Sequence, residues 1–313
     1  MEMSSTSERP RPRSFEPVTV FCGKGGVGKT SLSLAFALRQ AGQGFRVLVI
    51  TSHPLPELAL SVSLAGLKET DPVAASGLFV VHIDPREILS DVVRQNLGSS
   101  RLTDALLSSR IYQSLVEVVP GLKEIAVVSR VRDLAVQGVG PEAPAGFDRV
   151  VWDAPATGHF LRTLEVARDF DSHLSGPLAL LGKSLSGFLS RPSSMRLIPV
   201  AILEEMAVDE TIELCEKLAG GLGMPPAALV CNMASPLLGT SEAEWEKLRR
   251  DLPGEVGNPA GAAFILERHA IERQLFTKLR HACGIPPRIL ARKAGWKSDI
   301  ELLLNLAGKM DGL

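Results

Sequence analysis

The chain has 313 residues, of which 45% are hydrophobic and 22% are charged, and its formal net charge is −1. This composition is ordinary for a globular protein, and a net charge near zero gives no overall field that would favour nucleic acid or an anionic membrane surface. No apolar run approaches the length of a membrane span. We therefore expect no nucleic-acid partner and no transmembrane segment.

The N-terminus and the cysteines bear on the compartment. Residues 1–16 are polar, contain proline and arginine, and lack the apolar core of a signal peptide, so we expect a disordered tail. The cysteines contain no C-x-x-C pair, which argues against a structural zinc site and fits a reducing, cytoplasmic compartment. They are Cys22, Cys215, Cys231 and Cys283.

Predicted strands alternate with predicted helices along the chain. We expect strands at residues 18–22, 45–50, 78–83, 147–153, 196–200, 227–231 and 287–290, and helices at residues 29–41 and 298–307. This alternation predicts an α/β fold with a doubly wound, mostly parallel sheet flanked by helices. We expect residues 17–313 to form a single domain, with small helical segments at about 86–137 and 170–192.

A phosphate-binding loop is predicted between the first strand and the first helix. Its residues read G-K-G-G-V-G-K-T and match the P-loop pattern G-x-x-x-x-G-K-[ST]. Glycines let backbone N–H groups converge on phosphate oxygens, and the following helix points its positive end at the same place. In this pattern Lys29 reaches the β- and γ-phosphates of ATP and the Thr30 hydroxyl ligates Mg²⁺. The residues expected to bind nucleotide here are Gly23, Lys24, Gly25, Gly26, Val27, Gly28, Lys29, Thr30 and Ser31.

A ligand-free glycine turn is the alternative, but it leaves two lysines in one tight loop unexplained. The second lysine, Lys24, directly follows the first glycine of the loop. The G-K-G-G-x-G-K-T form resembles the deviant Walker A group of ATPases, which includes the MinD/ParA, nitrogenase iron protein and ArsA types. That resemblance implies a dimer that closes face to face over two nucleotides, with Lys24 acting on the partner's phosphates much as an arginine finger does. A solvated lysine is the alternative for Lys24.

Two later strands are each predicted to end in a polar residue. In open parallel sheets ligands bind at the carboxyl ends of strands. Asp153 follows the apolar run Val150 to Trp152, and we expect it to hold Mg²⁺ together with Thr30, because an unpaired carboxylate is costly to bury for packing alone. Asn232 follows the strand predicted at 227–231 and is placed to hydrogen-bond an adenine edge. A turn-forming asparagine is the alternative there.

The segment from Asp153 to Arg162 narrows the family. Its residues, D-A-P-A-T-G-H-F-L-R, resemble the D-T-A-P-T-G-H-T-L-R segment of the arsenite-pump ATPase (ArsA) and of the ATPases that target tail-anchored proteins. The resemblance implies that Thr157, Gly158 and His159 belong to switch II, the loop that senses the γ-phosphate. The P-G-L-K-E run at residues 120–124 resembles a second element of the same family. The likeness extends from about Val18 to the C-terminus.

The second predicted strand departs from the family at the position of the catalytic aspartate. It is followed by Thr51-Ser52-His53-Pro54, where the family has S-T-D-P. The resemblance implies that the missing aspartate positions or activates the attacking water, so His53 is the candidate catalytic residue beside Lys24 and Lys29. A neutral imidazole can accept a proton but lacks the carboxylate charge, and Glu57 is the other candidate. We therefore expect nucleotide binding with slow hydrolysis or none.

The specialised activities of the family are less well supported. Arsenite binding needs several clustered thiolates, and the cysteines are scattered, with Cys22 and Cys231 in predicted buried strands. The zinc clip and long Met-rich insert of the tail-anchored-protein members are absent. Apolar residues at helical spacing could form a small partner-binding face, although a core-facing helix is the favoured interpretation. They are Leu174, Leu178, Leu181, Leu185, Phe188 and Leu189.

These observations predict an ArsA-like ATPase that dimerises around Mg·ATP and uses binding and hydrolysis to switch its shape against a partner or cargo. The main alternative is a weakly hydrolysing or non-hydrolysing regulatory or scaffold subunit paired with a related, active chain. The dimer could thus be a homodimer or a heterodimer. A ParA/MinD-like positioning switch is the weaker third hypothesis, because residues 299–306 form a plausible core helix without basic character.

Overall fold

The computed structural model describes residues 18–52, 77–97, 100–118, 121–136, 147–169, 185–191, 194–239, 241, 243–244, 246–247, 250–251, 259–292 and 299–313. The predicted N-terminal tail, His53, Glu57 and residues 170–184 lie outside these ranges. No helix in the described part of the chain is long and apolar enough to cross a membrane.

Within the described ranges, seven parallel strands form one sheet in the order β3-β2-β4-β1-β5-β6-β7. The strands are β1 (Val18–Gly23), β2 (Val47–Thr51), β3 (Leu78–His82), β4 (Arg149–Ala156), β5 (Met195–Ala201), β6 (Val230–Ala234) and β7 (Arg288–Ala291). Strands β2 to β4 lie on one side of β1 and β5 to β7 on the other, which is the doubly wound arrangement. The predicted α/β fold is therefore confirmed.

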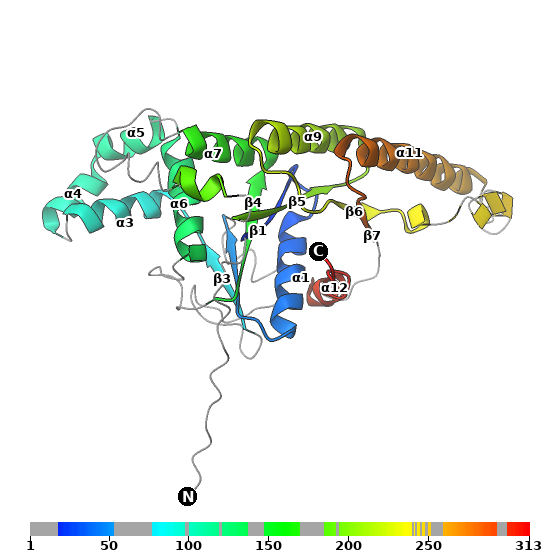
Figure 1. Cartoon of the computed structure of the whole chain (residues 1–313), viewed down its shortest axis with the longest axis horizontal. Helices are drawn as coiled ribbons and strands as arrows, with labels where there is room; N and C mark the ends of the chain where they lie inside the picture. The colour runs from blue at the N-terminus through cyan, green and yellow to red at the C-terminus, as the bar shows by residue number, and fades with distance from the viewer. Residues whose placement is uncertain are drawn as a thin grey trace, which may run out of the picture.

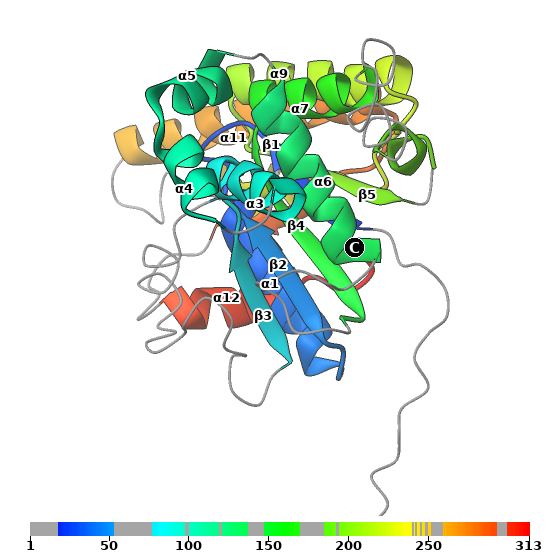
Figure 2. The ribbon, with the colours of Figure 1, turned by 90° about the vertical axis from the view of Figure 1, so that its left-hand side faces the viewer.

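Helices cover both faces of this sheet (Figure 1). The helices of the described residues are α1 (Lys29–Gly42), α3 (Pro85–Leu97), α4 (Arg101–Ser108), α5 (Arg110–Val118), α6 (Leu122–Val136), α7 (Thr157–Asp169), α9 (Glu205–Glu216), α11 (Pro259–Cys283) and α12 (Asp299–Ala307). A short π-helix, η2 (Lys217–Gly221), continues α9, and a 3₁₀ turn, η3 (Pro236–Gly239), follows β6. In Figures 1 and 2, α1 and α12 lie on one face, and α6, α7, α9 and α11 lie on the other.

Alternate residues of the central strands supply two separate cores. Val18, Val20 and Cys22 of β1 point to the face covered by α6 and α7, whereas Phe21 packs with α1 and α12 on the opposite face. All four side chains are fully buried. Because successive side chains of a strand point to opposite faces, a continuous apolar run buries a sheet on both sides. This explains why the predicted strands are almost uniformly apolar.

Between β3 and β4 lies the region, residues 86–137, for which the sequence predicts small helical segments. Helices α3 to α6 occupy it, and α3 and α6 pack against each other. In Figure 1, α3, α4 and α5 extend to one side of the sheet, beyond α6. Of the apolar stripe predicted at 174–189, the described residues Leu185, Phe188 and Leu189 are all buried in the core that α6 and α7 share. Their burial favours the core interpretation of the stripe.

Two predicted strand ends are wrong. β4 continues past Asp153 to Ala156, and β6 begins at Val230 and continues to Ala234, so both Asp153 and Asn232 lie within strands. In each case pairing with a neighbour extends the strand, because Ala156 pairs with Gly23 and Ala234 pairs with Ala291. Both extensions include a register irregularity, which a hydrophobicity pattern does not reveal.

The largest fully buried side chain of the sheet yields a test of the core. Trp152 is 1% exposed and its ring meets Phe160 of α7 edge to face, with centroids 5.6 Å apart. We expect Trp152→Ala to lower the free energy of unfolding by about 3–5 kcal/mol, measured by urea denaturation, because the cavity cannot collapse fully. Leu102→Ala is the control, since Leu102 is 82% exposed and its truncation should change stability by less than about 0.5 kcal/mol. Equal effects of the two substitutions would contradict this account of the core.

Candidate functional site

The loop between β1 and α1 holds backbone conformations that favour glycine. Gly23 has φ +143° and Gly28 has φ +90°. A Cβ on Gly23 would lie 2.3 Å from the carbonyl oxygen of Val200, and one on Gly28 would lie 2.5 Å from the side-chain nitrogen of Asn232. The loop is therefore packed closely from behind. Its outer edge is open, because a Cβ at Gly25 would meet no atom within 4 Å.

The two lysines of the loop have different environments. Lys29 is 8% exposed, and its Nζ donates a hydrogen bond of 2.9 Å to the backbone oxygen of Lys24. Burial lowers the pKa of the Lys29 ammonium, and the charge of Asp153 opposes that shift. The Lys24 side chain extends away from the loop and forms an ion pair of 2.9 Å with Glu210 of α9. One lysine is thus folded onto the loop, and the other is bound to a neighbouring helix.

Asp153 joins three elements beneath the loop. Its Oδ2 accepts hydrogen bonds from the Thr30 hydroxyl at 2.8 Å and from the Thr51 hydroxyl at 3.1 Å. Asp153 is 1% exposed, and its Cα is paired in the sheet with both Thr51 and Phe21. The predicted pair of Thr30 and Asp153 is therefore brought together at the end of the P-loop. Sequence reasoning missed Thr51, whose only signal is a hydroxyl at the end of an apolar strand.

These oxygens suit magnesium. Hydroxyl and carboxylate oxygens are the hard ligands that Mg²⁺ prefers, and Mg²⁺ is commonly held by one or two protein groups together with substrate phosphates. Thr30 and Asp153 supply one such group each, in mutual contact beside the loop. In the described part of the chain, no cluster of three or more His, Cys, Asp or Glu side chains could hold a metal by protein ligands alone.

Asn232 contacts the P-loop from β6. It is 6% exposed, and its Nδ2 donates a hydrogen bond of 2.9 Å to the backbone oxygen of Val27. The adjacent Met233 has a positive φ of 54°, which is uncommon for a side chain of this kind. The amide nitrogen thus supports the loop, a role that sequence reasoning missed. The predicted contact of Asn232 with an adenine edge stays a prediction.

The residues predicted to form switch II begin a helix. Thr157, Gly158 and His159 form the first turn of α7, which follows β4 without an intervening loop. Gly158 and His159 are exposed. Phe160 is fully buried against Trp152 and anchors the helix on the sheet. The exposed first turn of α7 is therefore followed by a residue packed firmly on the sheet. This turn lies at the same end of β4 as Asp153.

Two motifs that are distant in the sequence meet at α6 and α7. Arg162, in the segment resembling switch II, lies 3.6 Å from Glu124 of the P-G-L-K-E run. Gly121 has φ +87°, and a Cβ there would lie 2.5 Å from the Val166 side chain. The start of α6 therefore packs closely against α7. This contact gives both motifs a structural role in positioning α7.

The cysteines fall into two groups. Burial raises the pKa of both Cys22 and Cys231 to about 12, so these thiols are protonated and unreactive, as predicted from their strands. Cys215 and Cys283 are far apart in the sequence, yet their thiols hydrogen-bond. This contact raises the pKa of Cys215 and lowers that of Cys283. Sequence reasoning missed their proximity because it depends on the packing of α9 against α11.

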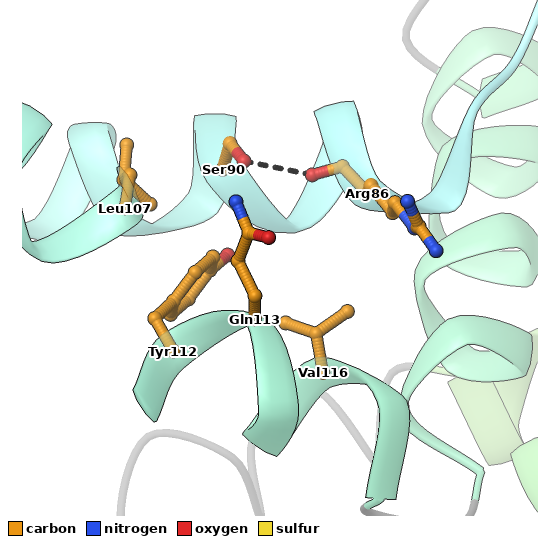
Figure 3. A pocket seen from close by; sticks show the side chains of 6 residues that line it. All are labelled: Arg86, Ser90, Leu107, Tyr112, Gln113 and Val116. Atoms are coloured by element: carbon orange, nitrogen blue, oxygen red, sulfur yellow. Dashed lines mark hydrogen bonds between the residues drawn. The ribbon is translucent and has the colours of Figure 1, made fainter. Parts of the chain in front are cut away.

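A small cavity lies among α3, α4 and α5 (Figure 3). Its volume is about 110 Å³, and Tyr112, Gln113 and Val116 face Arg86 and Ser90 across it. Ser90 donates its hydroxyl hydrogen bond to the backbone oxygen of Arg86. No residue predicted to bind nucleotide lines this cavity, which is also small for a nucleotide. The candidate site is therefore the P-loop with Asp153.

The glycine at the end of the loop provides a stability test. We expect Gly28→Ala to lower the free energy of unfolding of the nucleotide-free chain by about 1–3 kcal/mol, because the new Cβ meets Asn232 and the backbone requires a positive φ. Gly25→Ala is the matched control in the same loop, where the Cβ meets nothing, and it should change stability by less than about 0.5 kcal/mol. Chemical denaturation measures both. Equal losses of stability in the two variants would show that the close packing of Asn232 against Gly28 does not contribute to stability.

Comparison with known proteins identifies the family of the chain. The family model described as anion-transporting ATPase (ArsA) matches residues 17–195. An arsenical pump-driving ATPase of Acidiphilium multivorum is 31% identical over 75% of this chain and 42% of its own length. One from Escherichia coli is 30% identical over 69% of this chain and 39% of its own length, and ATPase GET3C of Arabidopsis thaliana is 32% identical over 49% and 42%. The chain spans less than half the length of these relatives. The matched model covers the P-loop, Asp153 and the start of α7, and the chain belongs to the anion-transporting ATPase family.

Proposed function

We propose that this chain binds Mg·ATP at the P-loop and hydrolyses it. The observation that carries the proposal is the convergence of Lys29, Thr30 and Asp153 at one end of the sheet, with Thr30 and Asp153 in contact at 2.8 Å. An ammonium and a hydroxyl–carboxylate pair beside an open glycine loop match the needs of a polyphosphate and its magnesium ion. The sequence likeness to proteins named as ATPases gives independent support.

Each residue has a separate task in this proposal. Backbone N–H groups of the loop, with the N-terminus of α1 behind them, bind the phosphate oxygens. Lys29 releases the backbone oxygen of Lys24 and donates to the β- and γ-phosphates instead. Thr30 and Asp153 hold Mg²⁺, which neutralises phosphate charge when bound. Thr51 keeps the Asp153 carboxylate in place from the neighbouring strand.

We propose that nucleotide state changes the shape of the site and that the change acts on a partner or cargo. The exposed first turn of α7, with Gly158 and His159, lies where it could respond to a γ-phosphate. The second lysine supports a dimer, formed with another copy of this chain or with a related chain. The free thiols of the four cysteines are compatible with a cytoplasmic location.

The second candidate function is a chain that binds ATP but hydrolyses it weakly. It is favoured by His53, which stands where the resemblance places a catalytic aspartate. An imidazole near neutral pH can accept a proton but does not supply a fixed negative charge. Such a chain would serve as a regulatory or scaffold subunit beside an active relative.

Removing the buried ammonium tests nucleotide binding. We expect Lys29→Ala to raise the dissociation constant of a fluorescent ATP analogue about 10- to 100-fold, since a hydrogen bond to a charged group contributes about 1.5–3 kcal/mol. Lys217→Ala is the control, because Lys217 is half exposed and pairs with Glu213 on the surface. A Lys29→Ala chain that binds as tightly as the control would refute the proposed site.

Restoring the carboxylate tests hydrolysis. We expect His53→Asp to raise the steady-state rate of phosphate release at least about tenfold over the original chain, because a positioned base typically contributes more than that. Affinity for ATP should stay unchanged, and His53→Ala controls for loss of the imidazole. A turnover in the original chain that His53→Asp does not raise would favour full ATPase activity over the weakly hydrolysing alternative.

A further inference from the structure

The side chain of Lys24 is held within its own chain. Its Nζ lies 2.9 Å from Oε1 of Glu210, and the two side chains are 31% and 39% exposed. Glu210 belongs to α9, which follows β5 and comes long after the P-loop in the sequence. The ion pair therefore ties the rim of the P-loop to a helix that packs on both β1 and β5.

The main chain of Lys24 is fixed independently of this ion pair. Its backbone oxygen accepts the hydrogen bond from Lys29, so the peptide of Lys24 is held against the loop. In the nucleotide-free chain the Lys24 side chain can therefore change direction without moving this peptide. In its present direction the ammonium is bound to a carboxylate, and a phosphate would have to compete with that carboxylate for the same charge.

Helix α9 offers several carboxylates, and its ion pairs are selective. Asp209, next to Glu210, pairs with Lys278 of α11 at 2.5 Å. Glu213, one turn later, pairs with Lys217. Asp209 and Glu213 are thus each paired with a different lysine. Among the described ion pairs, Glu210 pairs with Lys24. The contact is thus specific to one carboxylate of an acidic helix.

We propose that Glu210 is a positioning residue that holds Lys24 in the nucleotide-free chain, and that this ion pair opens when two chains close over ATP. The inference rests on the proposed function, because it assigns a regulatory partner to a lysine of the nucleotide site. Opening transfers the ammonium from the Glu210 carboxylate to a phosphate. Lys24 then becomes available only when phosphates replace its counter-ion.

The exposure of the pair sets the size of the effect. Ion pairs of this exposure shift an equilibrium by roughly two- to fivefold. An ion pair of this strength holds the Lys24 side chain in the nucleotide-free chain. It can still be broken when a polyphosphate, which carries more negative charge than Glu210, competes for the ammonium. In a homodimer two copies must open, so their combined effect on dimerisation is roughly four- to 25-fold.

The test compares dimer dissociation constants by sedimentation velocity at low ionic strength, with Mg²⁺ and a non-hydrolysable ATP analogue. We expect Glu210→Gln to dimerise at roughly four- to 25-fold lower protein concentration than the original chain. Asp209→Asn is the matched control, because it breaks the neighbouring ion pair on the same helix and should leave the constant unchanged. In a Lys24→Ala background Glu210→Gln should have no effect. If Glu210→Gln strengthened dimerisation equally in the Lys24→Ala background, Glu210 would act through the long-range electrostatic effect of its charge and not through Lys24. That result would overturn the proposal.

A second measurement needs no dimer. We expect Glu210→Gln to raise the rate of reductive methylation of Lys24 in the nucleotide-free chain roughly two- to fivefold, read by mass spectrometry of the Lys24 peptide. Asp209→Asn should leave that rate unchanged. An unchanged rate in Glu210→Gln, or weaker dimerisation, would overturn the proposal. If the chain binds the analogue but stays monomeric in every variant, the proposal about Glu210 is overturned and nucleotide binding stands. If the chain binds no nucleotide, the proposed function itself is contradicted.

Discussion

The carboxylate of Asp153 is the interaction on which the site depends. One oxygen accepts hydrogen bonds from Thr30 at the start of α1 and from Thr51 at the end of β2. A carboxylate that is 1% exposed is costly to bury, and hydrogen bonds from two hydroxyls reduce that cost. The same bonds fix the start of α1 relative to the sheet. The position of the P-loop therefore follows from satisfying one buried charge.

The sheet order makes this arrangement possible. β1 lies between β4 and β5, and β4 lies between β1 and β2, so the carboxyl ends of three strands are adjacent. Asp153 is in register with Phe21 on one side and with Thr51 on the other. Parallel strands deliver their carboxyl ends to one edge, where ligands of such sheets collect. Packing of both faces by helices then holds these ends in place.

Local patterns allowed the loop and the sheet to be predicted, and tertiary contacts account for what was missed. The P-loop and the apolar strands carry signals within a few residues. Nothing near Asn232 in the sequence indicates that its amide bonds to Val27, and nothing near Glu210 indicates Lys24. The pairing of Cys215 with Cys283 likewise depends on how α9 meets α11. Strand ends were misplaced because pairing partners, which lie far along the chain, extend β4 and β6.

The two lysines of the loop differ in what it costs to move them. Lys29 is buried beside the Asp153 charge, so withdrawing its ammonium from the site would leave that buried carboxylate without this positive charge. Lys24 lies at the rim in an ion pair that water partly screens, and breaking such a pair costs about 1 kcal/mol or less. In the proposed mechanism a nearby phosphate can therefore bind the Lys24 ammonium without a change in the loop, whereas the Lys29 ammonium remains in the site. Both lysines carry the same charge, so the difference in burial explains why Lys29 is held in the site and why the Lys24 side chain can change its partner.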